Sequence, residues 1–113
     1  MRKNDISILI TNFNKSYFLK KTINSCLKQN FKSKEILVFD DCSTDNSIEI
    51  LEKFKKIKLI KNKSKKYKSS PLNQIYGIIE LFKKSKGKLI FLLDGDDQFK
   101  KNKIQIIFNE FKK

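Results

Sequence analysis

Hydrophobic and polar positions along the chain follow two alternating periods, which predicts strands that take turns with helices. Short apolar runs without polar alternation are typical of strands buried on both faces. These runs lie at 7–11, 35–39 and 88–93, and 57–60, which contains Lys58, makes a weak third strand. Between and after them, apolar residues recur three or four positions apart, as on one face of a helix. The predicted helices cover 16–29, 48–54, 71–82 and 104–111.

Strands joined by helices in this way predict an α/β fold with one parallel sheet. The crossovers should be right-handed, as in a Rossmann-like domain. A chain of 113 residues holds one small domain. In such sheets ligands bind beyond the carboxyl ends of the strands, so functional residues are expected there.

The third predicted helix has the clearest start. Ser70 suits the N-cap and Pro71 the first helical position, where the missing N–H costs nothing. We expect Gly87 to lie in the C-cap region. Apolar residues then share one face of this helix, and we expect this stripe to pack into the core. The stripe consists of Leu72, Ile75, Ile78, Ile79 and Phe82.

The large positive net charge is weaker evidence for a nucleic-acid partner than its value suggests. The formal net charge is +14, yet Arg2 is the single arginine among 26 basic residues. A nucleic-acid surface would also use arginine for its bidentate fork, so we attribute the lysine excess to codon bias and expect no nucleic-acid partner. The alternative stays open because lysine fills eight positions of 55–68. On that reading the chain is a non-catalytic module for nucleic acid or an anionic membrane surface.

Missing residue types exclude several kinds of chemistry. The sequence has no histidine, so a Ser-His-Asp triad and a histidine-ligated metal are excluded. Two cysteines, Cys26 and Cys42, are too few for a disulfide framework and favour a reducing compartment. No apolar run reaches membrane-spanning length, and no signal peptide is evident. The expected location is the cytoplasm, including the cytoplasmic face of a membrane.

Five of the twelve acidic residues follow two predicted strands. They are Asp40, Asp41, Asp94, Asp96 and Asp97. Because parallel strands end at one edge, both groups should meet there. Oxygen donors alone suit Mg²⁺ or Mn²⁺, which take phosphate oxygens as further ligands. The pattern therefore predicts a nucleotide diphosphate held through a metal ion, since neither a Walker-type loop nor a GxGxxG loop is present.

Turn and cap chemistry is the competing interpretation of these acids. It is strongest for Asp45, since Ser43, Thr44 or Asp45 could cap the second helix. It is weaker for 94–97, since three carboxylates within four residues exceed the needs of a turn.

Three segments resemble the signatures of the family 2 glycosyltransferases, which are GT-A-fold enzymes that use nucleotide-diphosphate sugars. The segments are 7–14 (SILITNFN), 35–45 (EILVFDDCSTD) and 91–97 (FLLDGDD). The resemblance implies metal-assisted, inverting transfer from a donor, commonly a UDP-sugar, to a saccharide or lipid-linked acceptor. It also implies that 1–113 is the donor-binding N-terminal part of an incomplete GT-A domain. The general base is then expected downstream, so no catalytic residue is assigned within this chain.

The resemblance also assigns roles to single residues. It places Phe13 near the base, lets Asp41 accept a hydrogen bond from the base, and matches 94–96 to the DXD signature. The nucleotide-sugar-binding residues implied are Thr11, Phe13, Asp40, Asp41, Asn73, Asp94 and Asp96. The metal ligands implied are Asp96 and Asp97.

Two departures from the family pattern concern the phosphate contacts. Lys63 and Ser64 follow Asn62 where the family often has Asn-x-Gly, and Leu72 stands where an arginine often precedes the helical asparagine. A phosphate contact must then come from elsewhere. Lysines of the loop could supply it, although a solvated lysine run is the competing interpretation. These lysines are Lys65, Lys66 and Lys68.

Overall fold

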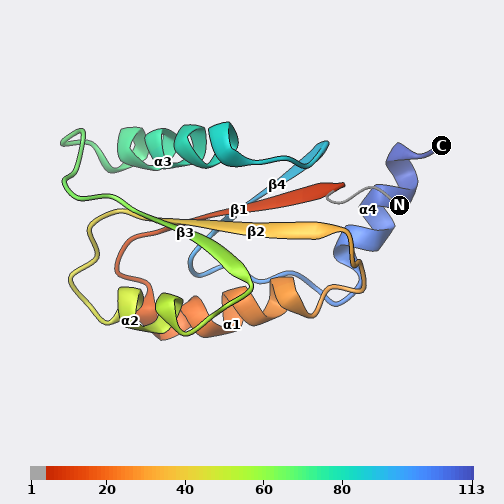
Figure 1. Ribbon diagram of the computed structural model, residues 1–113, viewed down its shortest axis with the longest axis horizontal. Coiled ribbons are helices and arrows are strands. Elements are labelled where there is room, and N and C mark those ends of the chain that lie inside the picture. The colour runs from red at the N-terminus through yellow and green to blue at the C-terminus, as the bar shows by residue number, and fades with distance from the viewer. Residues whose placement is uncertain (1–4) are drawn as a thin grey trace.

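The computed structural model describes residues 5–113 and has a four-stranded parallel sheet at its centre (Figure 1). The strands are β1 (Ile6–Asn12), β2 (Lys34–Asp40), β3 (Ile57–Lys61) and β4 (Leu89–Asp94). They lie in the order β3-β2-β1-β4. The helices are α1 (Ser16–Leu27), α2 (Ser47–Glu52), α3 (Ser70–Lys84) and α4 (Lys103–Phe111). The predicted alternation of strands and helices and the parallel sheet are confirmed.

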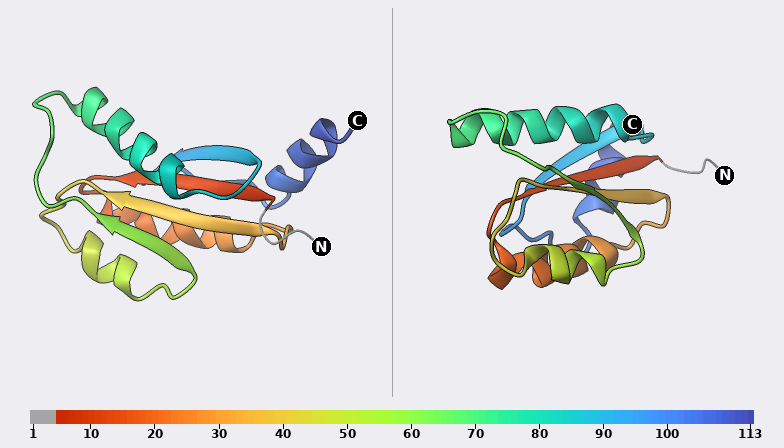
Figure 2. Two further views of the ribbon diagram at one scale, coloured as in Figure 1. Left: turned by 45° about the horizontal axis from the view of Figure 1, so that its top comes forward. Right: turned by 60° about the vertical axis from the view of Figure 1, so that its left-hand side comes forward.

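Helices cover the two faces of the sheet unequally. α1 and α2 lie against one face and α3 against the other, while α4 lies near the end where β1 begins (Figures 1 and 2). The core is accordingly divided in two. Ile8 and Ile10 pack on the α1 side with Leu19, whereas Leu9 and Leu81 pack on the α3 side. β1 is buried at every position because it lies between β2 and β4 and is covered on both faces.

The start of α3 differs by one residue from the prediction. Ser69 is the N-cap, and its side-chain oxygen accepts a hydrogen bond from the backbone N–H of Leu72 at 3.5 Å. Ser70 is therefore already helical, and Pro71 lies in the first turn, where it costs no hydrogen bond.

The face of α3 that meets the sheet is not the predicted one. Its buried residues are Asn73, Gly77 and Leu81, spaced four apart. A Cβ atom at Gly77 would lie only 2.6 Å from the Phe39 ring, so the helix backbone approaches the sheet through its smallest residue. The core assignment of the apolar stripe is wrong for its exposed members. These are Leu72, Ile75, Ile79 and Phe82.

Gly87 does not cap α3 but allows two backbones to pass close together. A Cβ atom there would lie 2.5 Å from the backbone where Ile6 joins Ser7. The backbone N–H of Gly87 donates to the Ser7 hydroxyl at 2.8 Å, and that hydroxyl donates to the buried Glu35 carboxylate. Lys58 completes the cluster with an ion pair to Glu35 at 2.9 Å. These contacts tie three strands together at the amino end of the sheet.

The two cysteine thiols are free. Burial in the core raises the pKa of Cys26 to about 12, so this thiol stays protonated and packs as an apolar group. Within residues 5–113, no helix combines the length and the apolar character needed to cross a bilayer.

Candidate functional site

The carboxyl ends of the strands gather at one edge of the sheet, on the left in Figure 1. In the strand register Asn12 lies beside Asp40, and Thr11 lies beside Asp94. A cavity of about 230 Å³ opens at this edge. It is lined by Thr11, Asn12, Phe13, Lys15, Phe39, Asp41, Lys65, Ser70, Asn73, Gln74 and Asp94. Both runs of aspartate thus reach a single cavity.

Asp40 is turned away from this cavity and holds the neighbouring backbone. Its carboxylate accepts hydrogen bonds from the Asn12 amide at 2.9 Å, the Ser43 hydroxyl at 2.7 Å and the Ser43 backbone N–H at 3.0 Å. The Cys42 backbone between them has φ of 60°, a left-handed conformation that reverses the chain. Asp40 therefore shapes the turn that presents Asp41.

Asp41 faces the cavity with both carboxylate oxygens engaged. One accepts from the Asn62 side-chain amide at 3.0 Å, and the other from the Lys65 ammonium at 3.1 Å. The same ammonium lies over the Phe13 ring, 3.4 Å from the ring centroid. Asn62 makes this contact although Lys63 and Ser64 replace the family's usual residues after it.

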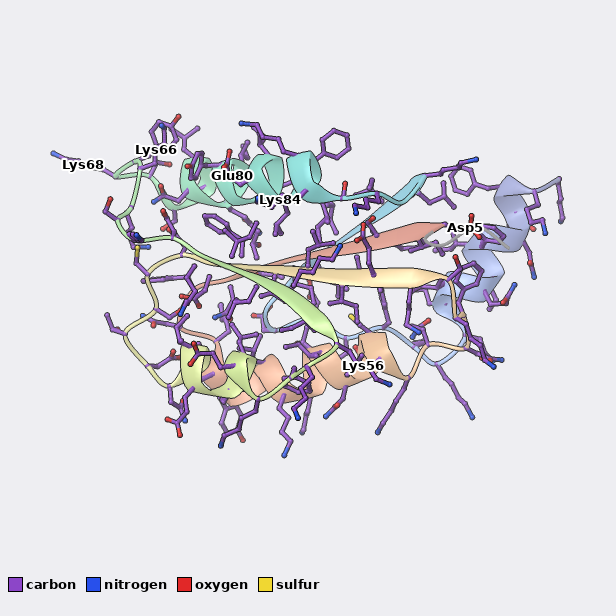
Figure 3. The ribbon with its side chains drawn as sticks, in the orientation of Figure 1. Asp5, Lys56, Lys66, Lys68, Glu80 and Lys84 are labelled. Carbon is purple, nitrogen blue, oxygen red and sulfur yellow. The ribbon has the colours of Figure 1, made fainter. Side chains whose placement is uncertain are left out.

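Asn73 anchors the lysine-rich loop that carries Lys65. Its side-chain oxygen accepts from the Tyr67 backbone N–H at 2.8 Å, and its amide donates to the Tyr67 carbonyl at 2.9 Å. One buried side chain on α3 thus satisfies both backbone groups of a loop residue. Of the three candidate lysines in this loop, Lys65 lines the cavity, Lys66 lies over the Tyr76 ring, and Lys68 points outward (Figure 3).

The segment after β4 forms a tight acidic turn. The Asp94 carboxylate accepts from the Gly95 backbone N–H at 2.8 Å, and the Asp97 carboxylate accepts from the Asp94 backbone N–H at 3.0 Å. Asp96 is exposed and forms an ion pair with Lys15 at 3.4 Å. A polar turn and a set of oxygen donors therefore coexist here, since each carboxylate has two oxygens.

Asp45 acts as a cap, but for two helices at once. Its carboxylate accepts from the backbone N–H groups of Ser47 at 2.9 Å and Ser16 at 3.0 Å, at the starts of α2 and α1. Partial desolvation of this largely exposed carboxylate opposes its ionisation, but hydrogen bonds from Ser47 and Ser16 outweigh that effect and lower its pKa to about 2. Ser43 and Thr44 do not cap α2, because Asn46 is its N-cap residue and no side-chain bond is made from that position.

Five residues that line the cavity were not predicted for the site from the sequence, namely Asn12, Lys15, Phe39, Ser70 and Gln74. Asn12 ends β1 as a buried polar side chain, Lys15 follows it, and Gln74 donates to the Thr11 hydroxyl at 3.4 Å. Among the described residues the Asn12 side-chain oxygen has no hydrogen-bond partner. A polar residue that ends an otherwise apolar strand could have indicated Asn12. Gln74 gives no comparable signal, because exposed helices carry many such residues.

The architecture is that of known GT-A-type glycosyltransferase structures. Residues 1–349 of Staphylococcus aureus TarS superpose with a TM-score of 0.79 at 22% identity, over 95% of this chain and 32% of that fragment. The mannosyltransferase PcManGT of Pyrobaculum calidifontis, solved with GDP-Man and Mn²⁺, gives 0.69 at 13% identity, over 87% of this chain and 29% of that one. These likenesses establish the fold.

The sequence establishes the family. Residues 7–113 match glycosyl transferase family 2, and the chain belongs to this family. The cholesterol galactosyltransferase of Borreliella burgdorferi is 31% identical over 99% of this chain, which spans 30% of that protein. An uncharacterized glycosyltransferase of Rickettsia conorii is 40% identical over 89% of this chain, which spans 16% of it. The chain thus covers a third or less of these relatives.

Proposed function

We propose that this chain binds a nucleotide-diphosphate sugar, with UDP as its nucleotide, as the donor-binding part of an inverting glycosyltransferase. The acceptor would be a saccharide or a lipid-linked molecule. The observation that carries the proposal is that Asp41 and Asp94, from separate acidic runs, line one cavity at the carboxyl edge of the sheet. Related folds support it, because TarS has been solved with UDP and with UDP-GlcNAc.

The cavity offers complementary contacts for the parts of such a donor. The Phe13 ring is 40% exposed and offers a flat apolar surface to a nucleobase. The Asp41 carboxylate can accept an N–H hydrogen bond from that base. Thr11 and Asp94 lie side by side on neighbouring strands, where hydroxyl and carboxylate oxygens can meet a ribose. Asp40 and Asn73 support the site by holding the turn and the loop around it.

The acidic turn after β4 fits a divalent cation that shares its ligands with phosphate. Within the part of the chain that the structure describes, no three acidic or cysteine side chains are placed to enclose a metal ion. Mg²⁺ or Mn²⁺ bound beside a nucleotide needs only one or two carboxylates, because water and phosphate oxygens complete its coordination. Asp96 and Asp97 would hold the ion, which would offset charge on the departing diphosphate.

Calorimetric titration with UDP and Mn²⁺ tests this assignment. Asp96→Asn and Asp97→Asn remove a charge with little change in shape, so each should weaken binding by about 1.5–3 kcal/mol, the worth of one charged contact. Glu110→Gln is the matched control, since it removes an exposed carboxylate on α4, which lies at the opposite end of the sheet (Figure 1), and it should leave binding unchanged. UDP binding by the two aspartate variants that is as strong as binding by the wild type would contradict the site.

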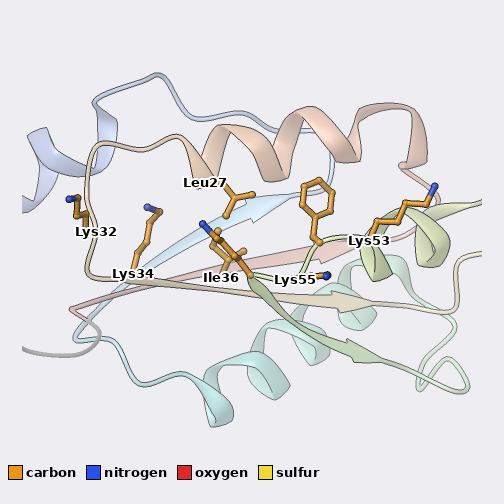
Figure 4. A pocket seen from close by; sticks show the side chains of 8 residues that line it. Leu27, Lys32, Lys34, Ile36, Lys53 and Lys55 are labelled. Carbon is orange, nitrogen blue, oxygen red and sulfur yellow. The ribbon is translucent and has the colours of Figure 1, made fainter.

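A second function, binding of a polyanion, has one observation in its favour. A hollow of about 580 Å³ between the ends of α1 and α2 is lined by lysines over a floor that includes Leu27 and Ile36 (Figure 4). Its lysines are Lys32, Lys34, Lys53, Lys55 and Lys56. However, the Lys34 ammonium already donates to the Phe31 carbonyl at 2.7 Å, and other lysines project from distant elements (Figure 3). Affinity for nucleic acid or anionic vesicles that falls steeply with salt would favour this function.

A further inference from the structure

One ammonium group covers both contacts that the proposed function reserves for a nucleobase. Lys65 Nζ lies 3.1 Å from an Asp41 carboxylate oxygen and 3.4 Å from the centroid of the Phe13 ring. The second Asp41 oxygen accepts from Asn62. The carboxylate and the aromatic face are thus both engaged before any ligand arrives.

A base could not use this slot while the ammonium stays in place. Stacking on an aromatic ring beside Asp41 needs the space directly over the ring face that turns towards this carboxylate, and Nζ fills that space. An N–H donor of the base would also compete with Lys65 for the same carboxylate oxygen. Entry of a base therefore requires Lys65 to move.

The loop is built so that the side chain can move while its backbone stays. Asn73 fixes the Tyr67 backbone on one side of Lys65, and the Asn62 side chain is bonded to Asp41 on the other. The Lys65 side chain itself is 38% exposed on a flexible four-carbon stem. Its ion pair and cation–π contact are each weak at such exposure, so a stronger anion can replace them.

We propose that Lys65 is a latch on the base slot that a diphosphate opens. This inference rests on the proposed function and assigns to this site its preference for charged nucleotides. The diphosphate of a donor brings more negative charge into the cavity than Asp41 alone. Lys65 then exchanges Asp41 and Phe13 for phosphate oxygens and supplies the cation that is missing at Leu72. An uncharged nucleoside has to displace Lys65 without offering it a new partner.

Titrations of uridine and UDP, at one fixed Mn²⁺ concentration, test the latch because the two ligands should respond in opposite directions. In Lys65→Met the slot is open, so uridine should bind about twofold to fivefold more tightly. UDP should bind about tenfold more weakly because one charge-assisted contact is lost. Lys65→Arg keeps the charge and should retain the preference for UDP. Lys68→Met, which removes an outward-pointing lysine of the same loop (Figure 3), is the control.

The outcomes separate the latch from the function on which it rests. If the wild-type chain does not bind UDP, the proposed function fails and the latch fails with it. If the wild type binds UDP but Lys65→Met weakens both ligands by the same factor, Lys65 is only part of the base slot. If Lys65→Met behaves like Lys68→Met with both ligands, Lys65 has no role in binding. Either of these last two results overturns the latch and leaves the donor site standing.

Discussion

Replacing Gly95 by alanine tests how the acidic turn is held against β1. Gly95 is buried, and its carbonyl accepts a hydrogen bond from the Thr22 hydroxyl at 2.8 Å. A methyl group at this position would collide with the Asn12 side-chain oxygen and would lie 3.2 Å from Lys15 Cβ. The Gly95 backbone does not adopt positive φ, so the cost of alanine is steric.

Asn12 cannot turn aside without losing its own contacts. Its amide donates to Asp40 at 2.9 Å and to Ser43 at 3.3 Å. Breaking both contacts costs about 2 kcal/mol, since each hydrogen bond contributes about 1 kcal/mol. Shifting the turn instead is overpacking, which costs about 1–3 kcal/mol. Either response lowers the free energy of unfolding by about 2 kcal/mol, and the second also moves Asp96 and Asp97.

A double-mutant cycle measured by urea unfolding identifies the collision. Asn12→Ala removes the opposing oxygen, so the cost of Gly95→Ala should be smaller by about 1 kcal/mol in the Asn12→Ala background than in the wild type. Relief is partial because the contact with Lys15 Cβ remains. Gly77→Ala is the matched control, since its methyl group meets the Phe39 ring instead, and its cost should be the same in both backgrounds. Additive costs for Gly95→Ala and Asn12→Ala would refute the reasoning.

Two further expectations concern stability. Because the pKa of Asp45 is lowered from 3.8 to about 2, its stabilisation is complete above about pH 4 and is lost as the pH falls towards 2. In Asp45→Asn the free energy of unfolding, measured by urea unfolding between pH 2 and 5, should therefore fall less steeply with decreasing pH than in the wild type. The same fall in both proteins would contradict the double cap. Leu81→Ala should cost about 2–5 kcal/mol in urea unfolding, whereas Ile75→Ser on the exposed face of α3 should stay within about 0.5 kcal/mol. A large loss from Ile75→Ser would mean that this stripe is buried.

The sheet could be predicted because its two central strands, β1 and β2, are buried on both faces, whereas β3 and β4 at the edges are only partly buried. β1 and β2 carry apolar residues at consecutive positions, a pattern that neither an exposed strand nor an amphipathic helix needs. β1, β2 and β3 extend the predicted runs by one or two residues, and β4 is shifted by one; polar residues such as Asn12 and Asp40 continue the hydrogen-bonded ladder. Hydrophobic pattern alone cannot show that continuation.

The orientation of α3 could not be predicted by the same reasoning. Helical periodicity shows that apolar residues share a face, but not that this face meets the sheet. Here Gly77 allows closer backbone approach to Phe39 than Ile75 or Ile79 would permit, so the helix packs through a narrower face. The usual rule that the most apolar face is buried therefore fails where a small residue gives better packing.

The position of the acidic residues could be predicted from the sheet topology, but which of them faces the cavity and which holds the backbone could not. Parallel strands bring Asp41 and Asp94 to one edge, which the sequence order alone implies. Whether Asp40 or Asp41 faces the cavity depends on the turn at Cys42. The backbone of Cys42 is left-handed, and the sequence does not indicate this because the residue is neither glycine nor asparagine. The Asp40 carboxylate accepts hydrogen bonds from Asn12 and Ser43, and these contacts can be recognised only once the pairing of the strands is known.

Lys65 shows why a residue that lines a cavity is hard to predict from the sequence when its neighbours are of the same type. In a segment where most positions are lysine, no local pattern distinguishes the one that lines the cavity from its neighbours. The distinction comes from Asn73, whose side chain holds the Tyr67 backbone while Lys65 reaches Asp41 and Phe13. That arrangement depends on the close packing of α3 on the sheet through Gly77. The contact that made the predicted buried face of α3 wrong therefore also supports the helix that positions the lysine. The role proposed for Lys65 therefore depends on the tertiary fold, which selects one lysine of the loop from several with the same charge.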